Sequence, residues 1–73
     1  MTSYRFTIVV EQDEDGVYVA SCPALQGCYS QGDTFEDAVN NVKDAIRLHI
    51  EARREVGEPI PIEVAIDKVE INA

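Results

Sequence analysis

Residues 34–57 read TFEDAVNNVKDAIRLHIEARREVG, and this stretch predicts an amphipathic helix between a cap and a stop. Apolar residues recur three or four positions apart in this stretch, which places them on one face of a helix. Thr34 followed by Asp37 is a capping-box pattern, and the acidic residues here suit the positive end of a helix. Gly57 provides the stop, so we expect the helix to begin after Thr34 and to end at about Val56.

Three short strands are predicted before this helix. Residues 4–10 alternate apolar and polar side chains, and residues 17–21 follow as the return strand of a hairpin, with Gly16 in the turn. Pro23 cannot donate a ladder hydrogen bond, so the second strand should end just before it. Residues 28–31 are then predicted to form a short third strand.

A fourth strand is predicted after the helix. Residues 62–66 alternate again, and residues 69–71 continue the pattern. The element order is β-β-β-α-β, an α+β fold in which an antiparallel meander packs one long helix on one face and the fourth strand joins the sheet. Such a helix is about 33 Å long at 1.5 Å per residue, so its C-terminal half should overhang the sheet. We expect a single domain over residues 1–73.

The charge balance limits the possible partners. The chain has 14 acidic and 6 basic residues, a net charge of −8, together with 45% apolar residues. That excess of acid argues against nucleic-acid binding and against docking on an anionic membrane, but it suits a basic protein partner. A domain of this size is marginally stable alone, so we expect a homodimer or a higher homo-oligomer.

The residues that usually carry catalysis or bind metals are scarce. Cys22 and Cys28 are the only cysteines and His49 is the only histidine, which is too few for a zinc site or a catalytic set. We interpret the cysteines as small buried hydrophobes in a reducing compartment, and His49 as a packing or interface residue. We therefore expect no enzyme activity, no cofactor and no metal, and a cytoplasmic location.

Two groups of acidic residues are the candidate partner-binding residues. The first group lies at the predicted hairpin tip and the second at the helix start. They are Asp13, Glu14 and Asp15, and Asp33, Glu36 and Asp37. The competing interpretation is that these side chains only form solvated turns and helix caps.

The order of motifs resembles that of the HicB-like antitoxin family. The matching segments are GVYVA at 16–20, CPALQGC at 22–28, QGDTFEDA at 31–38 and EPIP at 58–61. The resemblance covers about residues 4–66. The combined motif is much more specific than any of its parts.

The resemblance implies a partial ribonuclease H-like fold and a role in a type II toxin–antitoxin system. The antitoxin of this family binds a small basic HicA-like mRNA interferase and masks its active site. Longer members carry a C-terminal DNA-binding domain, for which residues 67–73 are too few, so we expect no operator binding. The glycines and the proline that precede the helix then form turns, whereas Thr34 caps the helix and Gly57 ends it. These structural residues are Gly16, Pro23, Gly27, Gly32, Thr34 and Gly57.

Two other functions remain open. The first is an orphan protein- or ligand-interaction module of the same fold without a toxin partner. The second is a remnant metal-dependent nuclease, although the acidic residues are not spaced as the converging carboxylates that a two-metal site requires.

Overall fold

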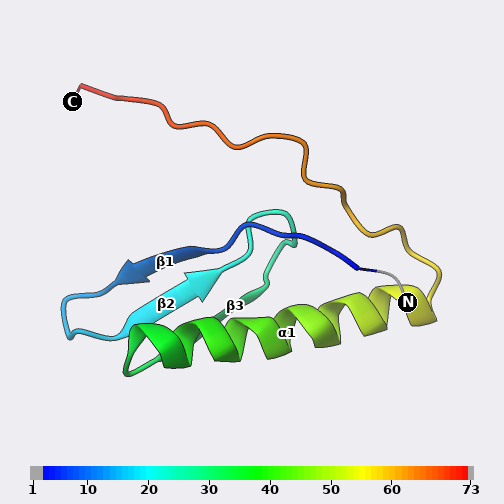
Figure 1. Cartoon of the computed structure of the whole chain (residues 1–73), viewed down its shortest axis with the longest axis horizontal. Helices are drawn as coiled ribbons and strands as arrows, with labels where there is room; N and C mark the ends of the chain where they lie inside the picture. The colour runs from blue at the N-terminus through cyan, green and yellow to red at the C-terminus, as the bar shows by residue number, and fades with distance from the viewer. Residues whose placement is uncertain (1–2, 73) are drawn as a thin grey trace.

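The computed structural model describes residues 3–72, in which three antiparallel strands precede one long helix (Figure 1). The strands are β1 (Val9–Gln12), β2 (Tyr18–Ser21) and β3 (Tyr29–Gly32), and the helix is α1 (Phe35–Glu55). The sheet order is β1-β2-β3, and α1 packs across one face of it. The α+β class and the order of these four elements are as predicted.

Both ends of α1 are closed by local hydrogen bonds. The Thr34 side chain accepts a hydrogen bond from the Asp37 backbone N–H at 3.0 Å. Gly57 has a φ of +73°, its N–H bonds the carbonyl of Arg54, and the next N–H bonds the carbonyl of Arg53. This pair of bonds is the Schellman pattern, which satisfies the free carbonyls of the last helical turn.

The first strand is displaced from its predicted position. The alternation of residues 4–10 places the strand there, but the ladder runs from Val9 to Gln12, with Val9 opposite Ser21 and Gln12 opposite Tyr18. Residues 4–8 extend beyond the end of β2 and therefore have no strand to pair with. The cause lies in the partner strand, because β2 stops before Pro23 and the chain turns there.

The core consists of aliphatic and cysteine side chains in two adjoining clusters. Ala20 of β2 packs against Ala38 and Val42 of α1, and the turn after β2 contributes a second cluster. The second cluster contains Cys22, Leu25 and Cys28. Gly32 allows β3 to approach the helix, since a Cβ there would lie 2.5 Å from the Ala38 backbone nitrogen.

The C-terminal arm, residues 58–72, runs back above β1 without joining the sheet (Figure 1). The predicted fourth strand at residues 62–66 is therefore not formed in the described chain. Its apolar side chains are exposed, to 87% at Ile62 and 92% at Val64. A strand needs a neighbour for its backbone groups, and the arm has none here. Within residues 3–72, no helix has the length and apolar character needed to cross a membrane.

Candidate partner-binding surfaces

The two predicted acidic groups come together at one end of the molecule. Tyr18 and Gly32 are paired across β2 and β3, which brings the β1–β2 turn next to the turn that leads into α1 (Figure 1). A shallow hollow here is lined by Val17, Asp33 and Asp37, among others. We call this the acidic end. It holds six of the chain's 14 acidic residues, which are Asp13, Glu14, Asp15, Asp33, Glu36 and Asp37.

The acidic side chains of the hairpin tip have different local roles. One Asp13 carboxylate oxygen accepts hydrogen bonds from the backbone N–H groups of Asp15 at 2.9 Å and Val17 at 3.0 Å. Asp13 therefore closes the turn, as aspartate commonly does, while Gly16 takes the positive φ of +84°. The Glu14 side chain is exposed and is free to meet a partner.

The helix start adds an exposed aromatic ring to the acidic end. Phe35 is 55% exposed and meets Tyr18 edge-to-face, with ring centroids 6.5 Å apart. Asp33, Glu36 and Asp37 around it are exposed as well. Phe35 is one of the apolar residues that recur three or four positions apart in residues 34–57, and this spacing alone predicts that it lies on the packed face. Phe35 is the first residue of α1, and the buried residues of the helix begin only at Ala38. Its place at the helix start is therefore the sequence signal that it lies on the surface.

A second surface lies at the opposite half of α1. An apolar groove of about 520 Å³ runs between residues 4–8 and the helix. Its apolar side chains are Tyr4, Phe6, Ile8, Ile46 and Ile50. Three of the six basic residues border it, Lys43, Arg47 and Arg54, with Glu51 beside them. We call this the basic-rimmed groove. Sequence reasoning missed it because its two sides are about 40 residues apart in the chain.

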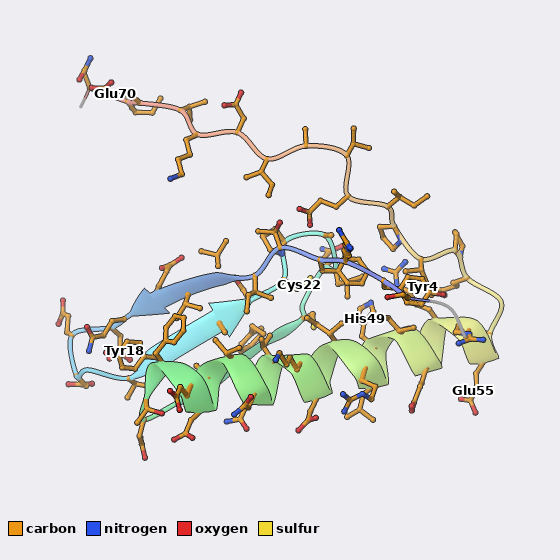
Figure 2. The ribbon with its side chains drawn as sticks, in the orientation of Figure 1. Tyr4, Tyr18, Cys22, His49, Glu55 and Glu70 are labelled. Atoms are coloured by element: carbon orange, nitrogen blue, oxygen red, sulfur yellow. The ribbon has the colours of Figure 1, made fainter. Side chains whose placement is uncertain are left out.

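His49 helps to fix the connection that follows the helix. Its Nε2 accepts a hydrogen bond from Arg53 Nε at 2.8 Å, and Arg53 Nη1 donates to the Pro59 carbonyl at 2.8 Å. Figure 2 shows the imidazole on the side of α1 that faces Tyr4. This agrees with a packing role for His49. Leu48, on another face, is 66% exposed.

Glu63 holds the start of the C-terminal arm against the N-terminal segment. Its carboxylate accepts hydrogen bonds from the Thr7 backbone N–H at 2.7 Å and from the Thr7 hydroxyl. Both hydrogen bonds lower the pKa of Glu63 because they stabilise the charged carboxylate, and the bond from the hydroxyl has the larger effect.

The cysteines are buried and unpaired. Burial raises the pKa of both the Cys22 and the Cys28 thiols, which disfavours the reactive thiolate form. No group of three histidine, cysteine or acidic side chains within residues 3–72 is arranged to hold a metal ion. What the described surface offers is charge, exposed aromatic area and an apolar groove, which are features of protein recognition.

Comparisons with known proteins agree on one family. A family model described as the HicB-like antitoxin of bacterial toxin–antitoxin systems matches residues 6–73. A UPF0150 protein of Synechocystis sp. is 48% identical over 89% of this chain and 82% of its own length. A UPF0150 protein of Thermoplasma acidophilum is 46% identical over 78% of this chain and 83% of its own.

A solved structure also matches the fold. The crystal structure of the N-terminal domain of Burkholderia pseudomallei antitoxin HicB superimposes with a TM-score of 0.73 at 34% identity. The match covers 84% of this chain and 72% of that one. Three antiparallel strands followed by one long helix are therefore an arrangement that a solved relative shares.

Proposed function

The chain belongs to the HicB-like antitoxin family, and we propose that it neutralises a small basic HicA-like mRNA interferase by binding and masking the toxin's RNA-binding surface. In this role it is not an enzyme, because neutralisation needs one antitoxin site for each toxin and no chemical step. The observation that carries the proposal is the acidic end, where the pairing of β2 with β3 brings the two acidic turns together beside an exposed phenylalanine.

The acidic end fits a toxin that binds RNA. Such a toxin must carry a cationic surface for phosphates, and carboxylates can occupy the same positions as those phosphates. Opposite charges speed the encounter, whereas affinity usually depends on a few desolvated anchor residues, among which aromatic side chains are frequent. Phe35, 55% exposed among carboxylates, has the surroundings of such an anchor.

Further properties follow from this role. The toxin's substrate is cellular mRNA and both cysteines are free thiols, so we infer that the protein acts in the cytoplasm. The net charge of −8 favours contact with the toxin rather than with nucleic acid itself. A ribonuclease H-like fold with a fourth strand would need the C-terminal arm to find a sheet edge, in the same chain or in another.

The test is an RNA-cleavage assay with a HicA-like toxin encoded beside this protein. An equimolar amount of the full chain should stop cleavage of a labelled RNA. Phe35→Ala should weaken toxin binding at least about tenfold, as loss of an aromatic anchor does. Tyr29→Ala is the matched control, because Tyr29 is 68% exposed on β3 and lies outside the acidic end, and it should change binding about twofold or less.

Two results would contradict the proposal. Continued RNA cleavage with excess protein would remove the toxin as a partner and favour the orphan interaction module. Full neutralisation by the wild type, with equal effects of Phe35→Ala and Tyr29→Ala on toxin binding, would show that the toxin contacts a surface other than the acidic end.

A further inference from the structure

The free part of the C-terminal arm, residues 64–71, exposes more apolar side chain than a short segment in water normally does. The exposed fractions are 92% for Val64, 66% for Ile66, 81% for Val69 and 77% for Ile71. Single exposed hydrophobic residues are common on protein surfaces, but several of them on one short segment usually mark an interaction site. Valine and isoleucine in alternation also favour a strand, which needs a neighbouring strand.

The arm is anchored at its start and released beyond it. Arg53 donates to the Pro59 carbonyl, and the Glu63 carboxylate accepts from Thr7. A neighbouring strand at the open edge beside Thr7 would accept a hydrogen bond from the Thr7 N–H with one of its backbone carbonyls. Here the Glu63 carboxylate accepts that hydrogen bond instead. The two backbones are therefore held apart at this point, and the arm does not close as a fourth strand on its own chain.

The basic-rimmed groove is not accessible to the arm of the same chain in this arrangement. The groove lies between residues 4–8 and α1, whereas Figure 1 shows the N-terminal segment lying between the arm and the helix. The arm and the groove are thus on opposite sides of residues 4–8. Each copy of the chain carries an unfilled apolar groove and an unburied apolar segment.

The arm and the groove are complementary in polarity and in charge. The groove has an apolar floor and a rim with one acid and three cations, in a chain whose net charge is −8. Of these cations, Arg47 is paired with Asp44 at 3.0 Å, whereas Lys43 and Arg54 have no such partner within residues 3–72. The free part of the arm, residues 64–71, carries two acids, Asp67 and Glu70, against the single base Lys68. An acidic segment with alternating apolar residues is therefore the kind of ligand that an apolar groove bordered by cations attracts.

We propose that the free part of the arm of one copy docks in the basic-rimmed groove of a second copy, with Val64 and Ile66 seated on the groove floor. Because each copy carries both surfaces, the exchange is reciprocal and closes as a two-fold dimer. Pro59 and Pro61 stiffen the connection after the helix, so that little freedom is lost when the arm docks. Glu63 stays on Thr7 of its own chain and acts as the pivot.

The dimer leaves the acidic end free. The groove uses the second half of α1 from Lys43 onward, and the acidic end uses its first turn. Arm docking and toxin binding therefore occupy different surfaces, and either one can fail experimentally without the other. The variants below lie outside the acidic end for that reason.

The first test is sedimentation equilibrium of the full chain and two arm variants. The wild type should be a dimer, and Ile66→Glu should raise its dissociation constant at least about tenfold by placing a charge on the groove floor. Ala65→Glu adds the same charge one position away, on the opposite face of the arm, and should change the constant about threefold or less. Circular dichroism checks that both variants keep α1.

Three results of this test would overturn the proposal. A wild type that remains monomeric at high micromolar concentration excludes the dimer. A dimer that Ile66→Glu does not weaken uses another surface. If the two variants weaken the dimer equally, the arm does not dock with the Val64 and Ile66 face on the groove floor.

The second test separates exchange between copies from closure within one chain. In a mixture of ¹³C-labelled and unlabelled chains, isotope-filtered NOE spectra should connect Ile66 methyls of one copy with Ile46 and Ile50 methyls of another. The same NOEs confined to a single chain would show that the arm docks in the groove of its own chain and would overturn the exchange. An arm without such NOEs in either form would overturn it as well.

Discussion

Asp13 and Glu14 are adjacent in the chain and carry the same charge, but the structure gives their carboxylates different surroundings. Asp13 bonds two backbone N–H groups of its own turn, whereas Glu14 is simply exposed. In the sequence, Gly16 indicates the turn, and the acids beside it are compatible with a role in turns and caps alone. Which of the acids closes the turn depends on the path of the backbone, which residue types alone do not specify.

Glu63 provides a pH-dependent contact at the residue scale. Its pKa lies below the ordinary glutamate value because the Thr7 hydroxyl and N–H stabilise the carboxylate. A carboxyl whose folded-state pKa is lowered contributes stability above its unfolded pKa, and this contribution is lost as the pH falls through the lowered value. We therefore expect the Thr7 amide resonance to keep its position at neutral pH and to shift at pH below about 4.3, the ordinary value.

An NMR titration with two variants tests this contact. Glu63→Gln should abolish the acid-range shift of the Thr7 amide, because a glutamine at this position does not titrate. Glu70→Gln removes a carboxyl farther along the arm and should leave the shift unchanged. A Thr7 amide that titrates normally in Glu63→Gln would show that another group is responsible.

The elements differ in how well the sequence predicts them. The predicted helix ends within one residue of Glu55, because its cap, apolar spacing and glycine stop are all local signals. The first strand is shifted toward the turn, because its limits depend on where β2 can pair with it. The fourth strand was predicted from alternation alone, but alternation does not supply a partner. Local elements are thus predictable, whereas pairing depends on residues distant in the chain.

The contact between β3 and α1 depends on the absence of a side chain at Gly32. A Cβ there would lie 2.5 Å from the Ala38 nitrogen and 2.7 Å from the Asp37 Cβ, so the strand and the helix would have to separate. Overpacking of this kind costs about 3 kcal/mol when backbone must move. We expect Gly32→Ala to lower the free energy of unfolding by about that amount, measured by urea denaturation.

Gly27→Ala is the matched control for this prediction. Gly27 has a φ of +77° and no atom within 4 Å of an added Cβ. Alanine there should therefore lower the free energy of unfolding only through the strain of the left-handed backbone. That cost is about 1 kcal/mol. A loss at Gly32→Ala no larger than at Gly27→Ala would contradict the close approach of β3 to the helix.

On the scale of the whole molecule, the net charge conceals an uneven distribution. Six acids gather at one end of the molecule, while three of the six basic residues border the groove at the other half of α1. The acids of the predicted site could be named from the sequence because they flank recognisable turns. Their meeting at one end follows from the pairing of β2 with β3, and the groove follows from the path of residues 4–8 over the helix. Neither arrangement is encoded by a local pattern.

The uneven distribution predicts that the position of charge, rather than its total, governs association with a basic toxin. Glu14→Lys with Glu36→Lys changes the net charge from −8 to −4 at the acidic end. Glu55→Lys with Glu58→Lys makes the same change at the far end of α1. Fields are screened over about 10 Å at 0.1 M salt, so only the first pair lies close enough to act on a toxin docked at the acidic end.

Stopped-flow association rates at low and high salt distinguish the two cases. The acidic-end pair should lower the association rate constant at least about tenfold and reduce its dependence on salt, as loss of electrostatic steering does. The far-end pair should keep most of the association rate constant and most of its dependence on salt. Equal slowing by the two pairs would mean that the total charge attracts the toxin, in which case the clustering of carboxylates beside Phe35 would have no part in recognition.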